Sequence, residues 1–228
     1  MSKIVNIIKA FLGLIIFFGV QLLTVTLFNN ILTNGGLVIR NLIYCGMELV
    51  TLGLLIIIHF DKLKEDFLDF DKNYEKYLKL AFRVYLIGLV VMVISNLIIN
   101  KYILVDNIAY NEQADRLVIF KYPFYSVLGI IVTGPFIEEM VFRLGFKRYF
   151  KSKIVYYVVS CILFAGVHVL NGISNPLELL YFIPYGSFAV AFAYILDKTN
   201  NIFSSTIIHT FHNTFSVLII VSLGLIGV

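Results

Sequence analysis

Long apolar stretches alternate with short polar segments along this chain. A transmembrane helix needs about 20 mainly apolar residues, and seven stretches meet that criterion. They cover approximately residues 4–29, 37–59, 79–100, 123–146, 154–171, 178–197 and 202–226. The last stretch contains Asn213 and Gly224, and a break there would give eight spans. The pattern predicts an all-α, polytopic bundle of transmembrane helices, and the short connections predict a single integral membrane domain over residues 1–228.

The composition agrees with this pattern. The 228 residues are 60% hydrophobic and only 14% charged, whereas soluble domains usually carry about a quarter charged residues. Cys45 and Cys161 both lie in apolar stretches, so we expect neither a disulfide framework nor a C-x-x-C metal site. The lysines lie in loops rather than on one basic face, so we expect the lipid bilayer and no nucleic acid as a partner. The oligomeric state stays open.

Basic residues in the connecting segments predict the orientation, because cytoplasmic loops carry an excess of Lys and Arg. Segment 60–79 contains five lysines, whereas the turn at residues 29–36 contains no Lys or Arg. High and low counts alternate along the chain, which predicts a cytoplasmic N-terminus. The abundance of Ile, Asn and Lys is typical of an AT-rich bacterial genome. We therefore expect a multi-pass protein of a bacterial plasma membrane.

Few strongly polar side chains remain inside the predicted spans. A charge at bilayer depth is costly, so such residues are usually paired or functional. In the fourth, fifth and seventh spans they are Glu138, Glu139, Arg143, His168, His209, His212 and Asn213. Counted along the helices from the cytoplasmic lysines, Glu138, His168 and His209 lie roughly 16–23 Å from the inner boundary. We expect three helices to bring their polar groups to one level.

The spacing of these residues predicts their partners. Glu139 and Arg143 lie four residues apart, so on a helix they can form an ion pair. Glu138 points about 100° away from Glu139 and needs another partner, for which a histidine of a neighbouring helix would serve. His209 and Asn213 are also four apart and carry donors that can stabilise an oxyanion. An interhelical hydrogen-bond pair is the alternative.

Two further features of the spans bear on the site. The second span contains Arg40 and Glu48, which snorkelling and an interhelical hydrogen bond would explain, so neither receives a role. In the fourth span, residues 134–135 are Gly-Pro, just ahead of the glutamates. This pair predicts a helix distortion, which would open a water-filled cavity.

A glutamate base, a histidine and two oxyanion donors form the set needed to attack a peptide carbonyl with water. Glu138 with His168 would remove a proton from the water, and His209 with Asn213 would hold the tetrahedral oxyanion. No serine or cysteine nucleophile is required. The residues therefore predict hydrolysis of a peptide bond in a membrane-embedded peptide or protein substrate.

Three motifs follow one another on consecutive helical hairpins: E-E-x-x-x-R at 138–143, F-x-x-x-H at 164–168 and H-x-x-x-N at 209–213. In this order they resemble the CPBP family, which comprises CAAX-processing intramembrane proteases and bacteriocin-processing or immunity relatives, also called Abi. The resemblance covers about residues 122–220 and implies a glutamic-type protease core there. It implies catalytic roles for Glu138, His168, His209 and Asn213, supported by Glu139, Arg143 and Phe164.

Other functions remain open at this point. A non-enzymatic membrane immunity or partner-binding protein could retain the same fold, with the polar cluster holding helices together. A transporter using Glu138 as a proton relay lacks the expected inverted repeat. His168, His209, His212 and Glu138 could supply a zinc site, but H-E-x-x-H is absent and His212 lies outside the family pattern. We expect no cofactor, with zinc as the alternative.

Overall fold

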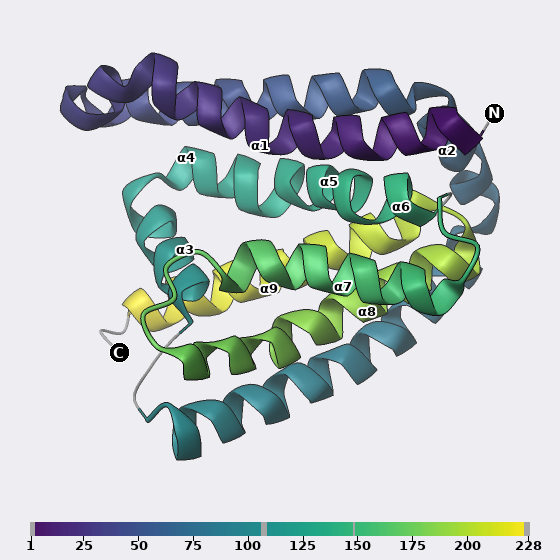
Figure 1. Ribbon diagram of the computed structural model, residues 1–228. Helices are drawn as coiled ribbons and strands as arrows, with labels where there is room; N and C mark the ends of the chain where they lie inside the picture. Colours follow the sequence, from purple (N-terminus) through teal and green to yellow (C-terminus); the bar gives the residue numbers. More distant parts are fainter. Residues whose placement is uncertain (1–2, 106–108, 148, 226–228) are drawn as a thin grey trace. The chain divides into compact units, whose positions relative to one another are not determined.

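The structure is a computed structural model that describes residues 3–105, 109–147 and 149–225. Every regular element within these ranges is a helix (Figure 1). The elements are α1 (Lys3–Asn34), α2 (Leu37–Ile98), η1 (Ile99–Ile103), α3 (Tyr110–Lys121), α4 (Pro123–Tyr125), η2 (Ser126–Thr133), α5 (Gly134–Glu139), η3 (Met140–Leu144), α6 (Gly145–Lys147), α7 (Lys153–Val169), η4 (Pro176–Tyr181), α8 (Phe182–Thr199) and α9 (Ile202–Leu225). The predicted all-α fold class is confirmed.

Four helical stretches in the described part of the chain are long and apolar enough to cross a membrane. They are Ile7–Asn34, Leu37–Ile103, Pro176–Thr199 and Ile202–Gly224. The pair Tyr110–Lys121 and Pro123–Lys147, which meet at a bend, gives a fifth if it counts as one span. Lys153–Val169 is apolar but shorter. The count of seven or eight spans stays a prediction.

The charged segment 60–79 is helical, so the expectation of a loop there is wrong. It lies within α2, which is 62 residues long. Residues 54–87 contain neither Gly nor Pro, and Lys, Glu and Leu are good helix formers. High charge moves a segment out of the hydrocarbon without breaking its helix. Helix α3 likewise occupies part of the connection between the predicted spans 79–100 and 123–146.

The chain forms two compact units that alternate along the sequence. The first comprises the described residues of Met1–Glu65, Arg116–Tyr149 and His209–Val228. The second comprises those of Asp66–Asp115 and Phe150–Ile208. The glutamate-bearing helix belongs to the first unit, and α7 with His168 belongs to the second. A single domain over the whole chain stays a prediction.

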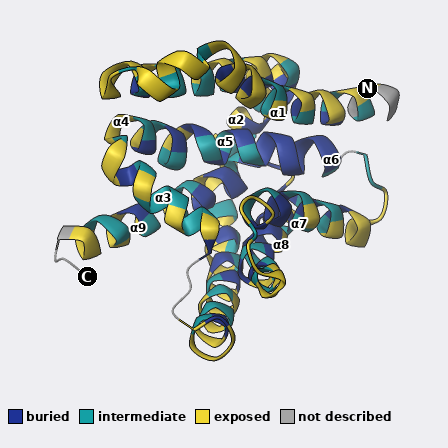
Figure 2. Ribbon diagram, turned by 60° about the vertical axis from the view of Figure 1, so that its left-hand side comes forward, coloured by how far each residue is buried: buried dark blue, intermediate teal, exposed yellow. Residues whose placement is uncertain are grey.

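In the first unit, α1 lies beside the first part of α2 and beside the segment from η3 to α6 (Figure 1). The Lys9 Nζ atom donates to the Ile58 carbonyl oxygen at 2.6 Å. A Cβ on Gly145 would lie 2.9 Å from the Ala10 Cα atom, so only glycine permits this close approach. The segment Met140–Phe146 is buried, whereas much of α1 is exposed and apolar (Figure 2). Such exposed apolar faces are suited to lipid contact.

In the second unit, α7 packs along α8, and α8 packs against the later part of α2. The rings of Tyr85, Phe188 and Phe192 stack in sequence, with centroid distances of 5.7 and 5.5 Å. The Ser187 hydroxyl donates to the Gly88 carbonyl oxygen at 3.1 Å. At the end of α8, Asn200 adopts a left-handed conformation with φ of 54°, which ends the helix and allows α9 to start.

Candidate active site

The two glutamates lie in a helical stretch whose turns change between π and α geometry. The π-helical segments η2 and η3 flank the α-helical turn Gly134–Glu139. The Gly134 N–H donates to the Gly129 carbonyl oxygen, five residues back. Pro135 has no N–H, and its ring crowds the preceding turn. The predicted distortion ahead of the glutamates is confirmed, and π segments of this kind are frequent at functional sites.

The distortion explains the contact that Asn213 makes. Because Gly134 bonds to Gly129, and Pro135 cannot donate, the carbonyl of Ile130 has no partner from the next helical turn. The Asn213 Nδ2 atom, from α9, donates to the Ile130 carbonyl oxygen at 2.9 Å. One of the two amide N–H groups of Asn213 thus supplies the hydrogen bond that the distorted helix does not provide to Ile130. The amide carries a second N–H that can serve an oxyanion.

Asn213→Ala is expected to lower the free energy of unfolding by about 1–3 kcal/mol, because it leaves a carbonyl of the distorted helix unsatisfied. Thermal unfolding of the purified protein in detergent measures this effect. Asn30→Ala is the matched control, since the Asn30 side chain accepts an exposed hydrogen bond from the Asn34 amide. Equal unfolding temperatures for the two variants would remove the structural role assigned to Asn213.

Glu139 is the centre of a buried charged cluster. The Glu139 Oε1 atom lies 2.9 Å from Arg143 Nη1 and 3.1 Å from His209 Nδ1. The side chains of Glu139 and Arg143 are fully buried. The predicted ion pair is therefore present, and His209 of α9 joins it. Since the carboxylate accepts, the Nδ1 atom of His209 carries a proton.

Glu138 differs from its neighbour in both exposure and contacts. Its side chain is 20% exposed, and its Oε2 atom lies 3.6 Å from His209 Nε2. That distance is an ion-pair distance but too long for a hydrogen bond. The two nitrogens of the His209 ring thus face two carboxylates. That of Glu139 is buried in an ion pair, and that of Glu138 is partly exposed. Of the pair, Glu138 is the carboxylate that water or a substrate can reach.

Arg40 and Glu48 both make contacts within the first unit. The Arg40 guanidinium donates to the carbonyl oxygens of Thr33 and Gly35, at 2.7 and 2.8 Å. It thereby satisfies carbonyls at the C-terminal end of α1. The Glu48 Oε1 atom accepts from the Thr133 hydroxyl at 3.3 Å, six residues before Glu139 on the distorted helix. No spacing rule within one helix indicates this contact between α2 and η2.

His168 lies on α7, and the F-x-x-x-H spacing explains how it is held. The His168 Nδ1 atom lies 2.8 Å from the Phe164 carbonyl oxygen, one helical turn back. The ring packs on Phe164 and on Tyr185, with centroid distances of 4.4 and 5.2 Å. With the proton on Nδ1, the Nε2 atom of the neutral ring is an acceptor. A histidine held in this tautomer can take a proton.

The structure thus brings Glu138, Glu139, Arg143 and His209 together in the first unit, with Asn213 on the same helix as His209. His168 and Phe164 belong to the second unit, and their part in a shared site stays a prediction. His212 lies in α9, half-buried. Within the described residues, no three His, Cys, Asp or Glu side chains form a group that could hold a metal ion. The independence from a metal also stays a prediction.

Comparison with known families bears on this arrangement. Residues 120–215 match the family model described as type II CAAX prenyl endopeptidase Rce1-like. All three motifs lie within the matched range. This segment is similar to the Rce1-like family. The resemblance that the motifs predict is confirmed for it, and the Rce1-like segment together with the apolar helices identifies an integral membrane protein.

Similar proteins occur in Lactococcus lactis. The UPF0177 protein YaiH of subspecies lactis is 29% identical over 125 residues, which are 54% of this chain and 49% of that protein. The UPF0177 protein YxdF of the same subspecies is 35% identical over 89 residues, 39% of this chain and 45% of that protein. A UPF0177 protein of subspecies cremoris, from the abiGi 5′ region, is 32% identical over 82 residues, 36% and 34%.

This chain therefore spans about half of these relatives or less. No solved structure matches it.

Proposed function

We propose that this protein is an intramembrane endopeptidase that hydrolyses a peptide bond of a membrane-associated peptide or protein. The observation that carries the proposal is the contrast between the two adjacent glutamates. Glu139 is fully buried and tied to Arg143 and His209, whereas Glu138 is partly exposed beside the same histidine. A buried ion pair alone would fix the helices. Hydrolysis requires in addition an accessible carboxylate that can act as the base, and Glu138 is that group.

In the proposed reaction, Glu138 acts as general base with His168 and takes a proton from water. The hydroxide oxygen attacks the peptide carbonyl carbon, and the carbonyl oxygen becomes an oxyanion. The Asn213 amide and the His209 Nε2–H group donate to it. The intermediate then collapses, the C–N bond breaks, and the leaving amine receives the proton held by the base. Every step uses side chains of this chain, without a metal.

Glu139 has a positioning role in this scheme. Its carboxylate accepts from His209 Nδ1 at 3.1 Å, so the other nitrogen, Nε2, is the one left to donate to an oxyanion. To donate, Nε2 must carry a proton as well as Nδ1. Arg143 in turn holds Glu139 in place. The E-E-x-x-x-R motif then supplies both the base and the support for the oxyanion donor.

The role of His168 can be tested by a double-variant cycle. If Glu138 and His168 activate one water, Glu138→Gln and His168→Ala should each remove most of the activity, and the double variant should be no worse than the single variants. The measurement is the rate at which new peptide termini appear in membranes of cells that express each variant. Effects that multiply would mean that the two residues act in separate steps.

The biological setting that we propose is a bacterial plasma membrane, with the N-terminus in the cytoplasm. Bacteriocin self-immunity, peptide-signal maturation and other membrane-protein processing all fit an endopeptidase of this type. Prenyl-protein cleavage does not follow from the family description, because a bacterial cell is not expected to supply prenylated proteins.

A second function is favoured by one specific observation. Asn213 donates to Ile130, and His209 contacts Glu139, so both expected oxyanion donors also hold helices together. A non-enzymatic membrane immunity or partner-binding protein would need these contacts alone. It would not need the accessible carboxylate of Glu138, and substitution at Glu138 separates the two functions.

A further inference from the structure

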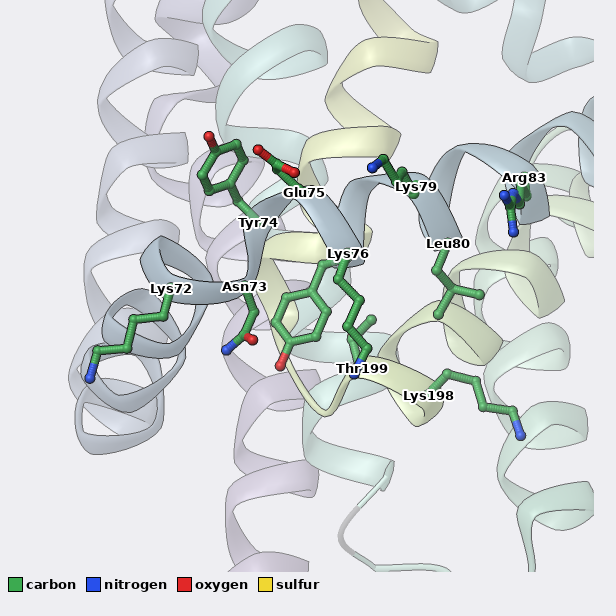
Figure 3. A pocket seen from close by; sticks show the side chains of 11 residues that line it. Lys72, Asn73, Tyr74, Glu75, Lys76, Lys79, Leu80, Arg83, Lys198 and Thr199 are labelled. Atoms are coloured by element: carbon green, nitrogen blue, oxygen red, sulfur yellow. The ribbon is translucent and has the colours of Figure 1, made fainter.

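A basic pocket of about 740 Å³ lies in the second unit, far along the sequence from the glutamate motif (Figure 3). Its lining comes from the charged part of α2 and the end of α8. The lining residues are Lys72, Asn73, Tyr74, Glu75, Lys76, Tyr77, Lys79, Leu80, Arg83, Lys198 and Thr199. Five of them are cations and one is an anion. Figure 3 shows Lys76 and Leu80 extending from α2 toward Thr199. The lining therefore favours an anionic ligand.

The five cations of this pocket outnumber its one anion, Glu75. Within the described ranges, Lys72, Lys76 and Lys79 form no ion pair, and neither does Arg83. Two carboxylates, Asp71 and Glu75, lie within this run of lysines, and within the described ranges neither forms an ion pair with these cations. The Asp69 carboxylate, just before the run, accepts its hydrogen bonds from neutral groups. Lysine and arginine side chains without carboxylate partners are the groups that bind phosphate oxygens.

A hydrogen-bond network around Asp69 holds part of the pocket lining in place. The Asp69 carboxylate accepts from the Tyr77 hydroxyl at 2.8 Å and from the Asn73 amide at 2.9 Å. It also accepts from the Asn201 amide at 2.9 Å. These bonds join α2 to the turn that follows α8. Because the lining is held in place, less conformational entropy is lost when a ligand binds.

The α8–α9 turn is anchored to the same part of α2. The Asp66 carboxylate accepts from the Ile202 N–H at 3.1 Å, and the Asn201 amide donates to the Asp66 carbonyl oxygen at 2.7 Å. The Thr199 hydroxyl donates to the Ile195 carbonyl oxygen at 2.8 Å. The pocket is thus built from two elements that several hydrogen bonds connect.

The position of the pocket along α2 indicates which anion it binds. Directly after Arg83 the helix becomes apolar, and Leu86, Ile87 and Val90 are 43%, 68% and 55% exposed. A phospholipid has the same order of groups, with a phosphate next to acyl chains. Basic residues at the end of an apolar span attract anionic lipids. A soluble anion would use the cations but not the apolar surface that follows.

We propose that this pocket binds the phosphate-bearing head group of an anionic phospholipid, with the acyl chains along the exposed face of α2 after Arg83. The proposal is independent of the proposed endopeptidase activity, since none of the lining residues belongs to the three motifs. A bound lipid would connect α2 to the end of α8 at the membrane surface.

The experiment titrates the full-length protein, purified in a neutral detergent, with three probes and follows binding by native mass spectrometry. The probes are phosphatidylglycerol, phosphatidylcholine with the same acyl chains, and glycerol phosphate without acyl chains. We expect phosphatidylglycerol to bind more tightly than either other probe. In the variant Lys76→Gln/Arg83→Gln its dissociation constant should rise about 25-fold, because each cation near a lipid surface contributes about a fivefold factor in affinity.

The matched control is Lys64→Gln/Lys151→Gln, which removes two exposed cations outside the pocket and should change the dissociation constant by less than about threefold. An equal loss in both double variants, or equal affinity for phosphatidylglycerol and phosphatidylcholine, would overturn the proposal. Equal binding of glycerol phosphate and phosphatidylglycerol would overturn the lipid assignment in favour of a soluble anion. If the pocket variant unfolds, the single variant Lys76→Gln should still show about a fivefold loss.

Discussion

Glu138→Gln is expected to reduce the formation of peptide products by about 10²- to 10⁴-fold, the range that a general base contributes. Glutamine keeps the size of the side chain but cannot accept the proton of the attacking water. The side chain is partly exposed and lies 3.6 Å from His209, so the loss of its charge should leave folding intact. The readout is a comparison of new N- and C-terminal peptides in membranes from wild-type and variant cells.

Glu48→Gln is the matched control for this experiment. Glu48 is another glutamate of the first unit, and it accepts a hydrogen bond from Thr133. A glutamine oxygen can accept the same bond, so we expect the rate of product formation to change by less than about tenfold. Equal expression and equal unfolding temperatures of both variants show that a loss of product reflects chemistry.

The same variant decides between the two proposed functions. If the protein confers a biological effect that survives Glu138→Gln at normal expression, catalysis is not its function, and the non-enzymatic alternative stands. If both products and effect disappear while the protein stays folded, the effect depends on hydrolysis.

The sequence predicted well those features that depend on one helix at a time. The Glu139–Arg143 ion pair follows from a spacing of four residues. The distortion ahead of the glutamates follows from the Gly-Pro pair at 134–135. Each of these features depends on contacts between neighbouring turns of one helix, which follow from residue spacing in the sequence.

Contacts between helices were harder to predict. The sequence indicated that Glu138 needs a histidine, but not that His209 would contact both glutamates. The Glu48–Thr133 hydrogen bond joins residues 85 positions apart, and its register depends on how the helices pack. The sequence did contain an indication of the Asn213–Ile130 hydrogen bond, namely Pro135. A proline removes an N–H, so the carbonyl it would have paired requires a donor from elsewhere.

The charged segment 60–79 was wrongly expected to be a loop because charge was used as a sign of chain reversal. Charge determines where a segment lies relative to lipid, whereas glycine and proline determine whether a helix continues. Residues 54–87 contain neither. The basic pocket depends on this difference, since a continuous α2 carries Lys76 and Arg83 on one rigid element.

Arg143→Met is expected to lower the free energy of unfolding by about 3–5 kcal/mol, the usual effect of removing one partner of a buried ion pair. Both Arg143 and Glu139 are fully buried, so the substitution leaves a carboxylate without its strongest neighbour in a medium of low polarity. Methionine fills a similar volume, which limits the contribution of a cavity. The measurement is reversible unfolding in mixed detergent micelles.

The chain offers a matched control for burial. The Lys153 Nζ and Asp197 Oδ2 atoms also lie 2.9 Å apart, but the Lys153 side chain is 63% exposed. Lys153→Met should therefore cost only about 0–1 kcal/mol, because the Asp197 carboxylate, which is 10% exposed, still accepts a hydrogen bond from the Tyr157 hydroxyl at 2.9 Å. The double variant Glu139→Gln/Arg143→Met should recover much of the loss, because it removes the uncompensated charge as well. If Arg143→Met and Lys153→Met destabilise equally, burial is not what gives the Glu139–Arg143 pair its strength. The support that this pair gives to His209 would then need another source.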